Sequence, residues 1–185
     1  MIKLDRRSFI GGAAAAATLP MLASRASAAD PLKVGYIYVG PINDGGWNTA
    51  HEAGRPEMLK KFGDKVQSQY VENVAEGPDA ERVLRDLYNQ GNRLLYATSF
   101  GFMDSAVKVA QAFPDVTVEM CTGFKPSSNN NLSNYNIRFH QARSVFGTMA
   151  AMLSKTGVGA YLATYPVPEV VSGIGEVRAG ELLKA

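Results

Sequence analysis

The sequence predicts an α/β fold built on a doubly wound parallel sheet. Short apolar runs that suit strands alternate with helical patterns between residues 33 and 121, which is the order that a parallel sheet with crossover helices requires. Two of the turns that lead from a strand into a helix are rich in glycine, aromatic and acidic residues. In open parallel sheets ligands bind at these carboxyl ends of the strands.

The expected elements follow in chain order. Residues 33–40 alternate apolar and small side chains like a buried strand, a helical pattern covers 47–62, and 66–74 alternates again. Pro78 opens a second helix that ends at Gly91. The remaining expectations are a strand over 93–98, a helix over 106–113, a strand over 116–121, a polar loop over 125–131, an extended segment over 132–137, a helix over 139–153, a strand over 157–164 and a helix from Val167 onward.

Residues 1–28 predict an export signal. Arg6 and Arg7 precede a small-residue apolar run, and Ala26 and Ala28 are the small residues that a signal peptidase reads. The paired arginines favour twin-arginine translocation, while an ordinary secretory signal stays open. The apolar run is shorter than the roughly 20 residues that a membrane span needs. Either route places the mature chain in the periplasm, after cleavage near Ala28.

Composition limits the function classes. Removal of 28 residues from 185 leaves 157, which suits one ordinary domain. The signal holds four basic residues and one acidic residue, so its removal changes the net charge from +2 to −1. A chain without basic excess argues against nucleic acid as a partner. Cys121 is the single cysteine, which excludes an intramolecular disulfide.

The first candidate turn surrounds Trp47. Asn43 and Asp44 precede the tryptophan, and Gly45 and Gly46 leave room for a ligand to approach backbone N–H groups at a helix start. The alternatives are core packing for Trp47 and turn formation for the two polar residues. The combination predicts a pocket for a flat small molecule with polar edges.

The second candidate turn carries Phe100, Phe102 and Asp104, and it is expected at the same edge of the sheet. Core packing for Phe102 and a favourable helix-dipole position for Asp104 are the alternatives. No residue set predicts catalysis, a metal or a cofactor. The two histidines lack ligand-spaced partners, and neither a P-loop nor a nucleophile elbow is present.

Several segments, in chain order, resemble the basic membrane protein family of extracytoplasmic substrate-binding proteins, which serve ABC importers and include purine base and purine nucleoside binders. The similar segments are 34–47, 70–74, 97–104, 113–116 and 165–171. The resemblance implies a type I periplasmic-binding-protein fold, in which two α/β lobes close on the ligand. It places an N-terminal lobe at 29–131, and the hinge crossing with the start of a second lobe at 132–185.

The resemblance also assigns roles to single residues. Trp47 falls where the family has an aromatic residue that stacks on the base, and Asn43 and Asp44 occupy a polar pair of ligand-binding residues. Asp104 falls near a ligand-binding aspartate. Tyr38 stands where nucleoside binders usually place an aspartate, which makes a free purine base or a related heterocycle more attractive.

Family members continue for well over a hundred further residues, so the chain is interpreted as truncated, with the second lobe only begun. Met149, Met152 and Leu153 would then lie on an apolar face without a partner. The sequence predicts a monomeric solute-binding protein for a purine base or nucleoside that delivers its ligand to an inner-membrane ABC permease. It predicts no enzyme activity and no cofactor. A non-functional gene remnant and an exported α/β enzyme are the alternatives.

Overall fold

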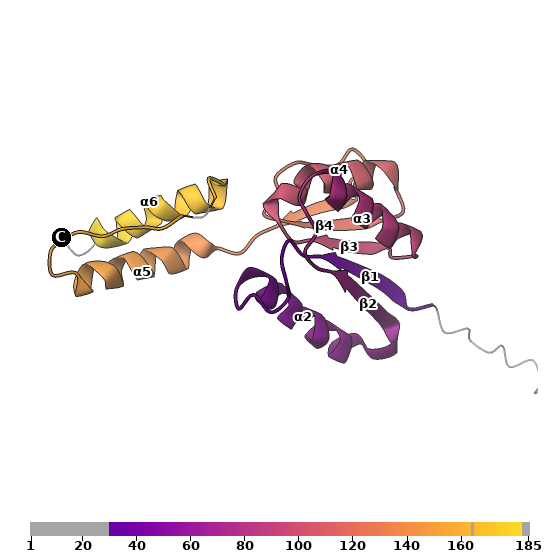
Figure 1. Ribbon diagram of the computed structural model, residues 1–185, viewed down its shortest axis with the longest axis horizontal. Helices are drawn as coiled ribbons and strands as arrows, with labels where there is room; N and C mark the ends of the chain where they lie inside the picture. The colour runs from indigo at the N-terminus through magenta and orange to yellow at the C-terminus, as the bar shows by residue number, and fades with distance from the viewer. Residues whose placement is uncertain (1–29, 164, 183–185) are drawn as a thin grey trace, which may run out of the picture. The chain divides into compact units, whose positions relative to one another are not determined.

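The computed structural model describes residues 30–163 and 165–182 (Figure 1). The predicted export signal at 1–28 lies outside these residues. Within the described part of the chain, no helix combines the length and the apolar character that a membrane crossing demands.

The described residues form one five-stranded sheet in which every pair of neighbouring strands is parallel. The strand order is β2-β1-β3-β4-β5, so the chain first adds a strand on one side of β1 and then returns to build outward on the other side. The predicted doubly wound sheet is therefore confirmed. Its strands are β1 (Leu32–Ile37), β2 (Val66–Val71), β3 (Leu94–Ala97), β4 (Thr117–Cys121) and β5 (Leu132–Tyr135).

The helices follow the expected pattern. Helices α3 and α4 pack beside each other on one face of the sheet, and α2 lies on the opposite face against β2 (Figure 1). The helical elements are α2 (Trp47–Phe62), η2 (Gly63–Lys65), α3 (Pro78–Asn89), η3 (Phe100–Phe102), α4 (Met103–Ala112), α5 (Phe139–Leu153) and α6 (Pro168–Leu182).

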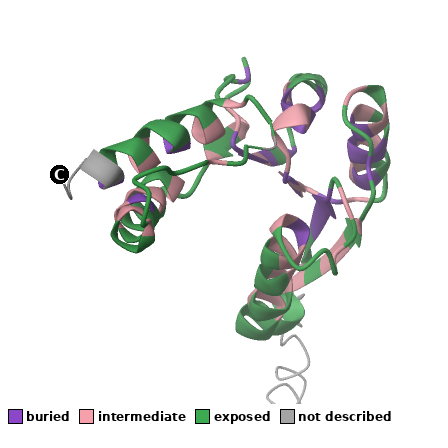
Figure 2. Ribbon diagram, turned by 60° about the vertical axis from the view of Figure 1, so that its left-hand side comes forward, coloured by how far each residue is buried: buried purple, intermediate pink, exposed green. Residues whose placement is uncertain are grey.

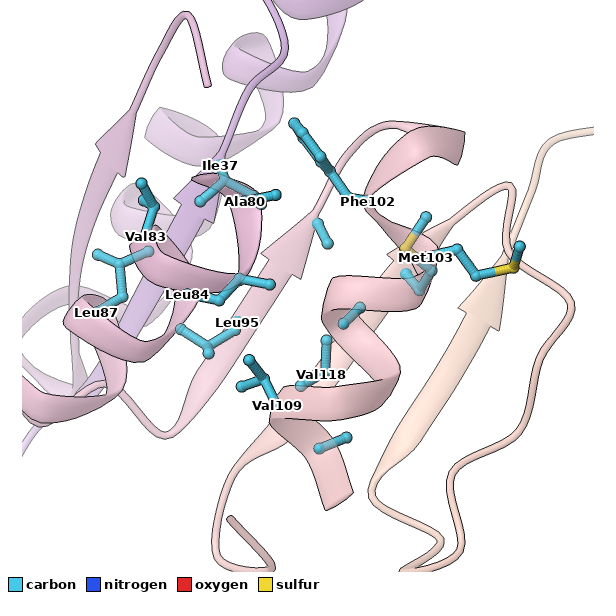
Figure 3. Close-up of a cluster of buried hydrophobic side chains, with 14 of the residues drawn as sticks. Ile37, Ala80, Val83, Leu84, Leu87, Leu95, Phe102, Met103, Val109 and Val118 are labelled. Carbon is cyan, nitrogen blue, oxygen red and sulfur yellow. The ribbon is translucent and has the colours of Figure 1, made fainter. Parts of the chain in front are cut away.

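The main hydrophobic core lies between the sheet and helices α3 and α4. In α3 the buried residues recur at helical spacing, so one apolar stripe faces the strands. Figure 3 shows the side chains of this stripe pointing toward those of β1, β3 and α4. The labelled members are Ile37, Ala80, Val83, Leu84, Leu87, Leu95, Phe102, Met103, Val109 and Val118.

One predicted element is wrong. The sequence predicts a strand over 157–164, but the structure contains no strand in residues 154–163. A strand needs a neighbour to satisfy its backbone N–H and C=O groups. The apolar alternation of Val158, Ala160 and Leu162 meets no such neighbour among the described residues, and Leu162 is 98% exposed.

Helices α5 and α6 pack closely through glycines. A Cβ atom on Gly147 would lie 2.1 Å from the backbone oxygen of Val177, and one on Gly180 would lie 2.1 Å from that of Ser144. Glycine is therefore required at both positions.

Helices α5 and α6 are mainly exposed (Figure 2). Met149, Met152 and Leu153 are exposed, as the sequence predicts. Phe146 adds to the same exposed set.

We predict that Leu95→Ala destabilises the chain by about 2–5 kcal/mol, because Leu95 is fully buried in β3 and its truncation leaves a cavity in the main core. Urea unfolding followed by circular dichroism measures the change. Lys60→Ala, at an exposed position of α2, is the control and should shift the free energy of unfolding by less than about 0.5 kcal/mol. Equal effects of the two substitutions would contradict the assigned core.

Candidate functional site

The strand order places a topological switch point between β1 and β3. The chain leaves β1 toward β2 on one side and reaches β3 on the other, so the loops that follow β1 and β3 diverge at the carboxyl edge. Such a crevice is where open α/β sheets bind ligands. The two turns selected from the sequence, at 40–46 and 99–104, flank it, and the second of them includes η3 and the start of α4.

Trp47 joins the two loops at this switch point. Its indole Nε1 donates a hydrogen bond of 2.6 Å to the backbone oxygen of Thr98, which directly follows β3. The Thr98 hydroxyl in turn donates to the backbone oxygen of Ile37, at the end of β1, over 2.8 Å. The indole is half-buried and fixed at one edge. Its orientation is therefore set by the sheet as well as by α2.

Asp44 holds the start of α2. Its Oδ1 accepts hydrogen bonds from the backbone N–H groups of Gly46 and Thr49, and its Oδ2 accepts from that of Asn48. The side chains of Asn48 and Thr49 donate two more. The backbone bonds from Asn48, Gly46 and Thr49 hold the pKa of the Asp44 carboxyl far below its usual range. The carboxylate therefore satisfies N–H groups that a helix start leaves open.

Asn48 is buried in the turn behind Asp44. Its side-chain nitrogen lies so close to Gly40 that a Cβ atom there would be 2.8 Å away. Its Oδ1 is buried and has no hydrogen-bond partner among the described residues. Glu72 completes the turn, because its carboxylate accepts from the backbone N–H of Ile42 over 2.9 Å. The turn is thus held on several sides.

Tyr38 is fully buried and belongs to a polar network under α2. Its hydroxyl donates to Glu52 over 3.0 Å, and Glu52 forms a bidentate ion pair with Arg55. Burial and the bond to Glu52 raise the pKa of Tyr38 well above its usual value, while the bonds from Arg55 and Tyr38 lower that of Glu52. Arg55 also lies over the ring of Tyr70. The network fixes α2 to the sheet.

The three candidate residues of the second turn differ in how far they are buried. Phe102 is fully buried in the main core, whereas Phe100 is half-buried and lies 6.3 Å from Phe124 between ring centroids. Asp104 is exposed and forms an ion pair of 2.5 Å with Lys125. The structure thus brings Trp47 to the edge of this turn through Thr98, and it places Asp104 beside a lysine that the sequence did not single out.

A hollow lies at the carboxyl end of β4, with a cavity volume of about 370 Å³. Phe139, the first residue of α5, lines this cavity, and its ring centroid lies 6.2 Å from that of Trp47. Sequence reasoning missed these residues because the pattern around Phe139 indicates only a helix start. Among the residues that the structure describes, no group of three or more histidine, cysteine or acidic side chains could hold a metal ion.

These features define an open parallel α/β ligand-binding domain with its candidate site at the switch point. The chain belongs to the family of PnrA-like ABC transporter substrate-binding proteins, whose model matches residues 32–180. The family interpretation made from the sequence is therefore confirmed.

Two curated relatives match most of this chain. A purine-binding protein from Brucella abortus is 48% identical over 160 residues, which cover 86% of this chain and 45% of the relative. A Haloferax volcanii protein named as an ABC transporter glucose-binding protein is 30% identical over 155 residues, which cover 83% of this chain and 38% of the relative. The chain thus spans under half the length of these relatives.

Solved structures agree with the fold. An ABC transporter solute-binding protein from Conexibacter woesei matches with a TM-score of 0.58 and 27% identity, over 80% of this chain and 49% of that chain. One from Aeropyrum pernix matches with a TM-score of 0.67 and 21% identity, over 83% and 43%. The α/β lobe predicted from the sequence is that of these binding proteins.

We predict that Asp44→Ala lowers the melting temperature at pH 7 and that this difference shrinks as the pH falls below about 4. The folded pKa of Asp44 lies below the unfolded value of about 3.9, so its stabilisation is present above the unfolded value. It is lost as the pH falls toward the folded pKa. Melting curves by circular dichroism between pH 2 and pH 7 give the profile.

Asp64→Ala serves as the control, because Asp64 is an exposed carboxylate in the short η2 turn. It should lower the melting temperature little at any pH. A constant difference between wild type and Asp44→Ala across the acid range would contradict the assigned role of the Asp44 charge.

Proposed function

We propose that this chain carries the N-terminal ligand-binding lobe of an exported solute-binding protein that takes up a purine base or purine nucleoside for an ABC importer. The observation that carries the proposal is Trp47, an indole fixed by Thr98 at the switch point of the sheet. Family membership and the Brucella abortus relative, which is named for purine binding, support it.

Trp47 suits a planar ring because its own edge is already bonded. With Nε1 committed to Thr98, the indole has no need of a polar partner in the ligand. The rings of His51 and Phe139 lie beside it, with centroids 4.8 Å and 6.2 Å away, so the ligand is proposed to stack on the part of the indole that these two rings leave open. Base-aromatic stacking contributes about 1–3 kcal/mol per base. A pre-oriented ring loses little freedom on binding, which favours affinity.

The other candidate residues contribute in two ways. Asn43 and Asp104 are exposed, so they are the groups proposed to bond the polar edge of the ring, and Phe100 offers a second half-buried aromatic surface. The carboxylate of Asp44 is occupied by its own turn. Tyr38 and Phe102 are fully buried in this structure, so the proposal gives them a supporting role behind the site.

We predict that Trp47→Ala weakens purine binding by about 5-fold to 150-fold, the range that corresponds to the loss of one stacking contact. Trp47→Phe keeps an aromatic face but removes the bond to Thr98, so it should retain part of the affinity. Calorimetric titration of the 185-residue chain with adenine, guanine, hypoxanthine and their nucleosides measures both effects, with glucose as the competing ligand class.

Phe62→Ala, at the exposed far end of α2, is the matched aromatic control and should leave affinity unchanged. A wild-type chain that binds glucose and no purine would overturn the proposal. Unaltered purine affinity in Trp47→Ala would remove Trp47 from the site. A rise in melting temperature with purine is the accompanying sign of binding to the folded chain.

We further propose that the protein acts in the periplasm as a monomer and meets an inner-membrane permease. The paired Arg6 and Arg7 support export by the twin-arginine route. We predict that changing both arginines to lysine retains the precursor in the cytoplasm, as cell fractionation would show. Lys3→Arg leaves the pair intact and should be exported normally. Full export of the double variant would contradict the twin-arginine route.

A further inference from the structure

We propose that Glu76 is a positioning residue of the candidate site, because its carboxylate holds the turn that carries Phe100 and bonds Trp47. This inference rests on the proposed function and deepens it, since it says what keeps the two aromatic surfaces in place for a planar ligand. It assigns a role to the loop between β2 and α3, where the sequence indicates only the start of a helix.

The Glu76 carboxylate reaches the second turn through Ser99. Its Oε1 accepts a hydrogen bond of 2.8 Å from the Ser99 hydroxyl. Ser99 is the N-cap residue of η3, yet its side chain makes no capping hydrogen bond to that helix. A serine at this position commonly bonds the N–H groups of its own helix. Here the hydroxyl donates to Glu76, so the contact joins two loops that are separate in sequence.

Gly101 leaves the space in which the carboxylate lies. A Cβ atom at this position would overlap the carboxyl carbon and both carboxylate oxygens of Glu76. The backbone of Gly101 does not have a positive φ, so alanine could adopt its conformation. Glycine matters at this position because it admits the Glu76 side chain against the turn.

A second hydrogen bond joins the same two segments. The hydroxyl of Ser105, in the first turn of α4, donates to the backbone oxygen of Gly77 over 2.8 Å, and Ser105 is buried. Glu76 and Gly77 therefore hold the segment 99–105 at both of its ends. A single contact would leave the segment free to rotate about it, whereas two contacts define its orientation.

The segment held in this way is the one that fixes the Trp47 indole. The Thr98 oxygen that accepts from Trp47 Nε1 belongs to the peptide unit that Thr98 shares with Ser99. Since a peptide unit is planar, a change in the orientation of Ser99 also turns this oxygen. Phe100 directly follows Ser99 and moves with it. The bond from Ser99 to Glu76 therefore acts on both aromatic residues.

The test uses Trp47 as its own reporter, because it is the single tryptophan of the chain. Glu76→Ala should shift the fluorescence maximum to longer wavelength and increase quenching by acrylamide, since an indole that loses its bond to Thr98 is more open to water. Glu76→Gln keeps an oxygen acceptor for Ser99 on a side chain of the same size. It should therefore give the fluorescence of the wild type.

Gly101→Ala provides an independent variant. Its methyl group takes the space of the Glu76 carboxylate, so it should cause the same fluorescence change as Glu76→Ala. The double variant should show no larger change, because both substitutions remove one and the same contact. Additive changes would overturn the proposal, and so would wild-type fluorescence in Glu76→Ala.

Glu57→Ala is the matched control, since Glu57 is an exposed glutamate of α2, and it should leave the fluorescence unchanged. Calorimetric titration with hypoxanthine adds the functional measurement. Glu76→Ala and Gly101→Ala should each weaken binding about twofold to tenfold, the range that corresponds to one hydrogen bond, whereas Glu76→Gln should retain the wild-type affinity.

Unaltered hypoxanthine affinity in both alanine variants would overturn the positioning role and leave purine binding standing. A wild-type chain that binds no purine would overturn the proposed function. The fluorescence comparison needs no ligand, so it would still decide whether Glu76 holds the turn beside Trp47.

Discussion

The hydrogen bond from the Trp47 indole to the backbone of Thr98 is the interaction on which the candidate site depends. It crosses the point where the strand order reverses, and it links the helix that follows β1 to the loop that follows β3. This one hydrogen bond therefore fixes the orientation of the Trp47 ring at the switch point of the sheet.

Most of the charged groups near this point serve the structure. The Asp44 carboxylate accepts hydrogen bonds from the N–H groups of its own turn. The Glu52 carboxylate pairs with Arg55 and accepts a hydrogen bond from the Tyr38 hydroxyl. Such groups hold the loop and the helix without remaining free to select a ligand. The Asp104 carboxylate, which stays open to solvent beside Lys125, is therefore the better candidate for ligand contact.

The sequence predicted the sheet, its helices and the two turns because alternation, helical spacing and glycine-rich turns are local properties. The span of α2 was predicted to the residue. The strand over 157–164 could not be judged from local sequence, because a strand forms only where a neighbouring strand pairs with its backbone N–H and C=O groups. The roles of Asp44 and Tyr38 also depended on partners up to fourteen positions away in sequence, such as Glu52, and the cavity depended on segments from three elements.

Two separate packings meet beside the candidate site. The Trp47 ring is positioned by the sheet, whereas α6 is positioned by its contact with α5, which requires glycine at 147 and 180. Phe139 is the residue where the two meet, because it begins α5 and lies beside the Trp47 ring.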